Sequence, residues 1–115
     1  MTFEEWSKTE SIKPLESFTQ HGNNIQLCEV FFPNRKLCER TFFPYFFLNP
    51  PTVSYTIDLV IPENSEVSEK VVEFGGVLKN YYTDEGYGIP EFYELENAWK
   101  FNEWYTKKEN ESKTS

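Results

Sequence analysis

The side chains that could form a nucleophilic site are Cys28, Cys38 and His21. A cysteine nucleophile needs an accessible thiolate, a base within hydrogen-bond reach and a third group that orients the base. Both cysteines lie in apolar stretches of sequence, where burial raises the pKa of a thiol and disfavours the thiolate. We therefore expect two reduced, partly buried cysteines and a loop histidine, in a protein without enzymatic activity. If the two stretches pair as a hairpin, a cross-strand disulfide between the cysteines is geometrically conceivable, and this alternative is left open.

Metal and cofactor sites also lack their usual spacing. Two cysteines and one histidine are too few for a tetrahedral zinc site. Asp84 and Glu85 stand in a loop, but their neighbours do not supply the alternating oxygen ligands of an EF-hand. Glu91, Glu94 and Glu96 are more simply the solubilising charges of a helix than the paired carboxylates of a glycosidase. We expect no metal and no cofactor.

The charge of the chain argues against direct binding to nucleic acid. The sequence has 19 acidic and 11 basic residues and a net charge of −8 at pH 7, whereas binding to phosphates requires lysine and arginine. A stacking platform for single-stranded bases could form only where the aromatics of residues 45–47 lie near Arg35, Lys36 and Arg40. A negative surface attracts basic proteins instead, although it also keeps an aromatic-rich chain in solution.

Residues 81–105 form the most distinctive segment of the sequence. They contain nine aromatic residues, six carboxylates and a single base, Lys100. Aromatic side chains supply contact area and anchor an interface, and a surplus of carboxylates selects a positively charged partner. Not all of the 21 aromatics of the chain fit inside a core of this size, and exposed aromatics that cluster are typical of an interface.

We therefore predict a small acidic protein that engages a basic protein surface, with carboxylates that meet lysine and arginine and with aromatic anchors. The narrower form of this hypothesis is an inhibitor from a phage or mobile element, located in the host cytoplasm. It would mimic DNA and mask the nucleic-acid-binding site of an enzyme. The predicted contact residues are Glu66, Glu69, Glu73, Asp84, Glu85, Tyr87, Tyr93, Glu96 and Trp104.

Two other classes of function stay open. In the first, the exposed aromatics form the interface of a homo-oligomer, as in a structural or assembly subunit. In the second, aromatic side chains line a pocket for a small molecule. A stable homodimer would favour the first class, and a rise in melting temperature on addition of a ligand would favour the second.

The elements of the first half begin with a short helix over residues 3–11, because Thr2 and Glu5 have the spacing of a capping box. A further helical turn is expected at residues 15–18. Apolar and polar side chains loosely alternate in residues 25–32, and residues 37–43 follow as a return strand. The turn between them contains Pro33, so the pattern predicts a β-hairpin. The core face of its first strand is expected to carry Gln26, Cys28, Val30 and Phe32.

The second half opens with a break at Pro50 and Pro51, after a short edge segment expected at residues 46–48. Along residues 53–61 every second side chain is apolar, and this period of two predicts a strand with one buried face. Residues 65–76 fit a helix capped by Ser65 and ended by Gly75. Alternatively, residues 71–78 fit a strand that pairs across a Gly-Gly bulge, and the helix is favoured.

Residues 77–82 predict the next strand and residues 83–88 a loop. Pro90 and Glu91 are expected in the first turn of a last helix that Lys107 and Lys108 close. Its apolar stripe predicts burial of one face, and Tyr93, Lys100 and Trp104 lie off that stripe. The core residues expected on the stripe are Phe92, Leu95, Ala98, Trp99, Phe101 and Tyr105.

Together these patterns predict an α+β fold. A small antiparallel sheet of three to five strands would carry a short N-terminal helix and a C-terminal helix packed on one face. One domain is expected over residues 1–108, followed by a polar, disordered tail at residues 109–115. The N-terminus lacks the apolar core of a signal peptide and no stretch has transmembrane length, so a cytoplasmic location without membrane binding is expected.

Overall fold

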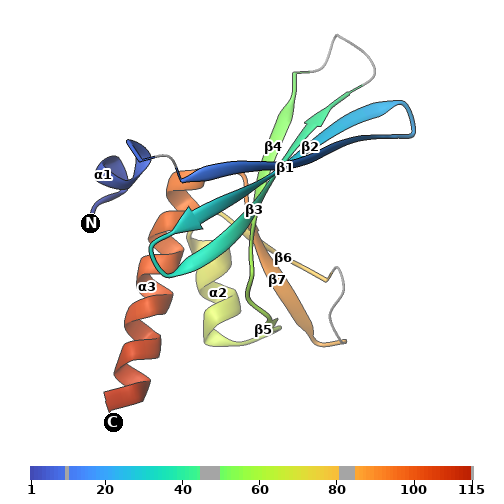
Figure 1. Ribbon diagram of the computed structural model, residues 1–115. Coiled ribbons are helices and arrows are strands. Elements are labelled where there is room, and N and C mark those ends of the chain that lie inside the picture. Colours follow the sequence, from blue (N-terminus) through green and yellow to red (C-terminus); the bar gives the residue numbers. More distant parts are fainter. Residues whose placement is uncertain (10, 45–49, 81–84, 115) are drawn as a thin grey trace. The chain divides into compact units, whose positions relative to one another are not determined.

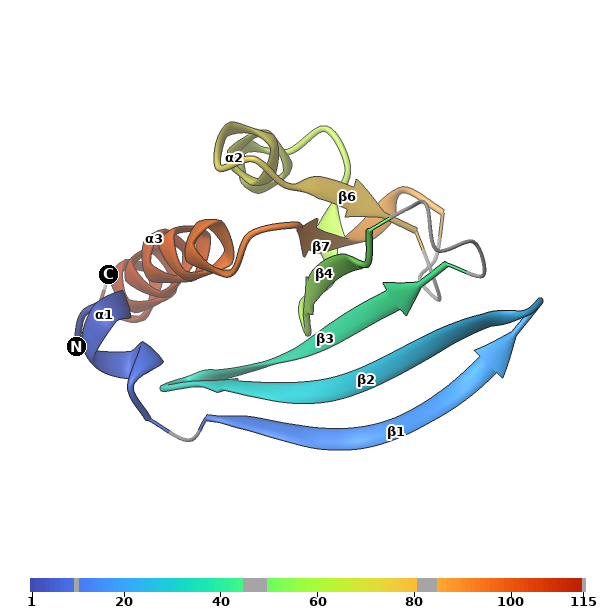
Figure 2. The same cartoon turned by 90° about the horizontal axis from the view of Figure 1, so that it is seen from above.

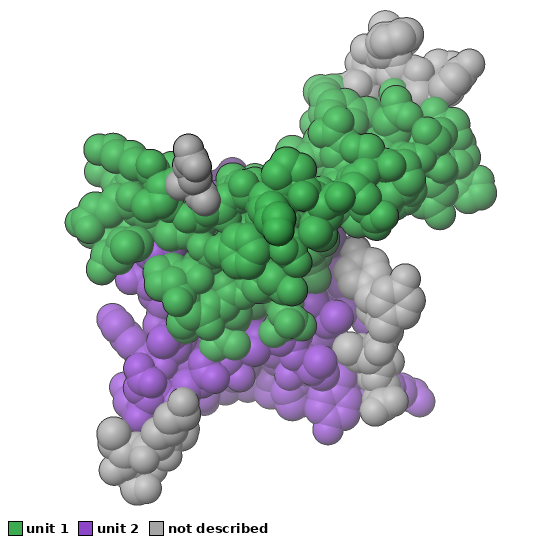
Figure 3. Space-filling model, viewed as in Figure 1, with its two compact units in different colours: residues 1–58 green, residues 59–115 purple. Residues whose placement is uncertain are grey.

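The computed structural model describes residues 1–9, 11–44, 50–80 and 85–114 (Figure 1). These residues form seven strands and three helices, and the strand pairings within each part of the chain are antiparallel. The predicted α+β class with helices near both termini is confirmed, with more strands than the three to five expected. The chain divides into two compact units, residues 1–58 (unit 1) and 59–115 (unit 2) (Figure 3). The single domain over residues 1–108 stays a prediction.

Unit 1 is a meander of four strands in the order β1-β2-β3-β4, preceded by a short helix (Figure 2). Its elements are α1 (Phe3–Ser7), β1 (Ile12–Gln20), β2 (Asn23–Phe32), β3 (Arg35–Phe43) and β4 (Thr52–Ile57). His21 and Gly22 connect β1 to β2 with φ angles of 52° and 81°, the positive values that a tight two-residue hairpin turn requires. The predicted hairpin around Pro33 is confirmed as β2 and β3.

Two predictions for the start of unit 1 are wrong. The first helix ends at Ser7 and not near residue 11, although Thr2 caps it as expected by accepting the Glu5 N–H at 3.2 Å. Residues 15–18 form part of β1 and not a helical turn. All nine residues of β1 are exposed, so the strand has no buried face to impose a period on its sequence, and backbone pairing with β2 determines its conformation.

The core of unit 1 is a cross-strand row of Val30, Leu37 and Ile57, which oppose one another on β2, β3 and β4 and are almost completely buried. Val30 and Phe32 confirm the predicted core face of β2. Gln26 on that face is exposed, however, and Ile25 on the opposite face is buried. The buried face of β2 is therefore the face of Ile25 at the start of the strand and the face of Val30 and Phe32 at its end.

Unit 2 combines short strands with two helices. Its elements are β5 (Ile61–Pro62), α2 (Glu66–Glu73), β6 (Val77–Lys79), β7 (Tyr87–Phe92) and α3 (Leu95–Thr114). The predicted strand over residues 53–61 is interrupted, because β4 ends at Ile57 and β5 begins at Ile61. The strand predicted to follow at residues 77–82 is described only as far as β6, since residues 81 and 82 lie outside the described part of the chain.

The segment at residues 65–76 is a helix, as favoured by its sequence. The Ser65 hydroxyl accepts the N–H of Ser68, and the Ser68 hydroxyl accepts the N–H of Ser65, so the two residues form a reciprocal cap. At the other end Gly75 has a φ of 89°. The N–H of Gly76 donates to the Val71 carbonyl at 2.8 Å and that of Gly75 to the Val72 carbonyl at 3.0 Å, which is the Schellman pattern.

The last helix begins later than predicted. Pro90 and Glu91 belong to β7, and α3 begins at Leu95. Gly88, Pro90 and Phe92 are buried on one face of β7, so period two and not the helical period decides this segment. At its far end α3 continues to Thr114, where a polar tail from residue 109 was expected.

The core of unit 2 is aromatic. The ring centroids of Phe92 on β7 and Phe101 on α3 are 5.5 Å apart, and Phe74 approaches Phe101 edge-on at 6.3 Å. Of the predicted core stripe, Ala98, Trp99 and Phe101 of α3 and Phe92 of β7 are buried. Leu95 and Tyr105 are only half-buried. The core therefore fixes α3 against the inner faces of β7 and α2 and leaves the outer face of α2 available.

Candidate interaction surface of unit 2

The nine predicted contact residues all belong to unit 2, although Asp84 lies outside the residues that the structure describes. Unit 2 has twelve acidic and six basic residues in its sequence, a net charge of −6, whereas unit 1 has seven acidic and five basic residues, a net charge of −2. The negative charge of the chain is therefore concentrated in the unit that carries the predicted surface. Unequal charge of this kind steers a charged partner to one part of a molecule.

The outer face of α2 presents Glu66, Glu69, Val72 and Glu73, which are all exposed. Their spacing of three and four residues places them on one side of the helix, opposite the buried Val71. Val72 is 65% exposed and, three residues after Glu69, borders the row of carboxylates. We call these four residues the α2 face: an acidic surface with an apolar side chain at its edge.

Two of the three carboxylates on the α2 face are already paired. Lys108 of α3 donates to Glu66 Oε2 at 3.0 Å, and Lys70 Nζ lies 3.0 Å from Glu73 Oε2. Glu69 forms no ion pair with another described residue. The spacing of Lys70 and Glu73 on one helix is visible in the sequence, but the pairing of Glu66 with Lys108 joins residues 42 positions apart and depends on the packing of α2 against α3.

Trp104 is less available than the sequence suggested. The Nζ atoms of Lys70 and Lys108 lie 5.7 and 5.6 Å from the centroid of its ring, within the range of cation–π contact. The Trp104 ring also packs against Phe101, with the two ring centroids 6.0 Å apart. Trp104 is therefore half-buried beneath two ammonium groups and does not project as the free aromatic anchor that was predicted.

Tyr87 and Tyr93, in contrast, are 43% and 53% exposed. The Tyr93 hydroxyl donates to Glu91 Oε2 at 3.4 Å. Glu91 is only 6% exposed, because it belongs to a strand and not to the exposed first turn of a helix where the sequence placed it. Tyr93 therefore keeps an exposed ring while its hydroxyl contacts a buried carboxylate.

The remaining predicted residues lie at the start of α3 and before β7. Glu96 is exposed and its Oε1 lies 3.8 Å from Lys100 Nζ. A Cβ atom built on Gly75 would lie 2.9 Å from Asn97 Nδ2, so the end of α2 meets the start of α3. Because Glu66 at the start of α2 contacts Lys108 farther along α3, the two helices run in opposite directions. Glu73 and Glu96 are therefore at the same end of the helix pair. Glu85 is exposed in the turn before β7.

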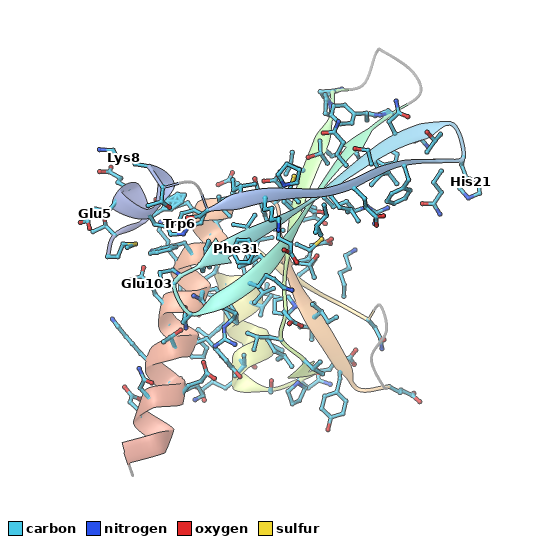
Figure 4. The ribbon with its side chains drawn as sticks, in the orientation of Figure 1. Glu5, Trp6, Lys8, His21, Phe31 and Glu103 are labelled. Carbon is cyan, nitrogen blue, oxygen red and sulfur yellow. The ribbon has the colours of Figure 1, made fainter. Side chains whose placement is uncertain are left out.

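The cysteines and the histidine do not form a site. Cys28 opposes Glu39 and Cys38 opposes Glu29 in the pairing of β2 with β3, so the two thiols lie on opposite faces of the hairpin and are free. Burial, followed by the charge of Glu39, raises the pKa of Cys28, and burial is the largest cause of the raised pKa of Cys38. His21 is at the far turn between β1 and β2 (Figure 4).

Within the described part of the chain, no cluster of three or more His, Cys, Asp and Glu side chains could hold a metal ion. The base-stacking platform considered at residues 45–47 lies outside the described residues. None of the described helices combines the length and the apolar character needed to cross a membrane. No family model, no curated protein and no solved structure matches the chain.

Proposed function

We propose that this protein is a non-enzymatic binding protein whose unit 2 engages a basic protein surface through the α2 face. The observation that supports the proposal is the exposure of Glu66, Glu69 and Glu73 beside the exposed Val72. A solubilising surface needs only scattered charges, whereas an exposed apolar side chain beside a row of carboxylates combines steering with a contact that excludes water.

Glu69 is the central residue of the proposed contact. It is exposed and forms no ion pair with the described residues, so a partner's lysine or arginine can approach it without displacing a cation of the protein. Tyr93, with its exposed ring near the start of α3, supplies an aromatic anchor of the kind that dominates binding energy at interfaces. Charge sets the rate of encounter and the apolar groups slow dissociation.

The narrower hypothesis, a DNA mimic that masks a nucleic-acid-binding site, needs consecutive free carboxylates at the spacing of phosphates. Glu66 and Glu73 are paired with lysines, which leaves Glu69 as the free member of the predicted row. The proposal is therefore stated for a basic protein surface as a chemical class, and inhibition of a nucleic-acid enzyme stays a prediction.

The proposal is tested with a fluorescent oligolysine peptide as the probe, whose binding is followed by anisotropy. Glu69→Gln is compared with Glu16→Gln, the same chemical change at an exposed position of β1 in unit 1. We expect Glu69→Gln to weaken binding by roughly two- to five-fold, and Glu16→Gln to leave it nearly unchanged.

Binding should also weaken as ionic strength rises from about 0.01 M to about 0.15 M, because the Debye length falls from roughly 30 Å to roughly 8 Å. Equal losses in the two variants would show that net charge, and not the α2 face, attracts the peptide. That result would reject the proposed surface.

A further inference from the structure

We propose that Lys108 is an internal competitor for the α2 face, whose ammonium group occupies the place that a cationic side chain of the partner would take. The inference rests on the proposed function and adds a means of regulating it. Lys108 comes from α3, while the carboxylate it contacts belongs to α2. The contact therefore joins two helices of unit 2 across the edge of the proposed surface.

The surroundings of the Lys108 ammonium group are those of a cation-binding position. Its Nζ donates to Glu66 Oε2 at 3.0 Å and lies 5.6 Å from the centroid of the Trp104 ring. A carboxylate and an aromatic face together favour an ammonium or guanidinium group. The position is already filled by a residue of the chain, so an external lysine or arginine can reach Glu66 only by replacing Lys108.

The replacement is feasible because the contact remains open to solvent. The side chain of Glu66 is 66% exposed and that of Lys108 is 39% exposed, and ion pairs of this kind are weak. The Lys70–Glu73 pair is similarly open, with side chains 31% and 62% exposed, but both of its residues belong to α2. Lys108 is therefore the paired cation that comes to the α2 face from another helix, and rotation of its side chain frees Glu66.

Removal of Lys108 should strengthen binding to a basic partner beyond the effect of a more negative net charge. Lys107 provides the matched control, because it is the adjacent residue of α3 and is exposed. It forms no ion pair with another described residue, and its change to glutamine alters the net charge by the same amount. We expect Lys108→Gln to bind the oligolysine peptide roughly two- to five-fold more tightly than Lys107→Gln.

Two further variants separate competition from a change in folding. Lys108→Arg retains a cation and should bind the peptide as the wild type does. In a Glu66→Gln background, Lys108→Gln should gain nothing over Lys107→Gln, because the competed carboxylate is gone. Far-UV circular dichroism and thermal unfolding of each variant identify any loss of α3, and if Lys108→Gln unfolds, Lys108→Met is compared with Lys107→Met.

The outcomes distinguish the inference from the function on which it rests. If the wild type binds the peptide and Lys108→Gln binds no more tightly than Lys107→Gln, internal competition is rejected and the proposed function survives. If neither the wild type nor any lysine variant binds the peptide even at low ionic strength, the proposed function is rejected and the competition with it. A gain for Lys108→Gln that persists in the Glu66→Gln background also overturns the inference.

Discussion

At the scale of single residues, Trp6 connects the N-terminal helix to the sheet of unit 1. Its indole N–H donates to the carbonyl of Phe31 at 2.8 Å, and its ring meets Phe32 edge-on with centroids 4.9 Å apart (Figure 4). The N–H of Phe31 in turn donates to Ser11, just before β1 begins. Trp6 therefore satisfies a strand carbonyl at the point where the pairing of β1 with β2 ends.

Replacing Trp6 by phenylalanine keeps an aromatic ring but removes the donor to Phe31. We expect the free energy of unfolding to fall by about 1–3 kcal/mol, because a partly buried carbonyl loses its hydrogen bond and the smaller ring packs less well. Urea denaturation followed by circular dichroism measures the change. Phe3→Leu, at the half-buried ring that stacks 5.9 Å from Trp6, is the control and should cost less. Equal losses would show that packing alone attaches α1.

At the scale of elements, the end of α2 depends on close approach of the backbone to β7. A Cβ atom on Gly76 would lie 2.6 Å from Phe92 Cε1 and 2.9 Å from the Glu91 carbonyl oxygen. Phe92 is completely buried, so neither the ring nor the backbone can move away cheaply. Gly76 is therefore required by contact, whereas Gly75 is required by its positive φ.

Gly76→Ala should lower the free energy of unfolding by about 1–3 kcal/mol, the usual cost of overpacking a rigid site. Val72→Ala, an exposed position on the same helix, is the control and should change it by less than about 0.5 kcal/mol. Thermal and urea unfolding of both variants provide the measurement. A Gly76→Ala variant as stable as the wild type would mean that α2 does not approach β7 as described.

The outer edge of β1 bears on the homo-oligomer alternative. Since Ser11 accepts the N–H of Phe31, alternation along the strand directs the backbone groups of Pro14 away from β2. Proline has no N–H to offer there, and the register shifts between Pro14 and Glu16. An absent donor and a bulge both disfavour pairing with another strand, so β1 is poorly suited to join a second copy of the chain.

At the scale of the whole molecule, the net charge of −8 at pH 7 creates self-repulsion that opposes folding. We expect the melting temperature at pH 7 to rise when ionic strength increases from about 0.01 M to about 0.15 M. The same increase at pH 4.7, near the isoelectric point given by the sequence, should have little effect. A fall at pH 7 would show that surface ion pairs such as Glu66–Lys108 outweigh the repulsion.

Much of the local structure could be predicted from the sequence. The hairpin around Pro33 and the helix capped by Ser65 carry their own turn and capping residues, so short-range physics specifies them. The start of α3 was mispredicted, because Pro90 and Glu91 suit the first turn of a helix as well as they suit a strand. The buried face formed by Gly88, Pro90 and Phe92 decides for the strand.

The candidate surface shows the same division. The sequence by itself determined that the second half of the chain is acidic and that Glu66, Glu69 and Glu73 share one side of a helix, because charge and helical spacing are local properties. Only the tertiary structure decided that Lys108 pairs with Glu66 and that two lysines cover Trp104. Those contacts depend on the packing of α2 against α3, which no local pattern encodes.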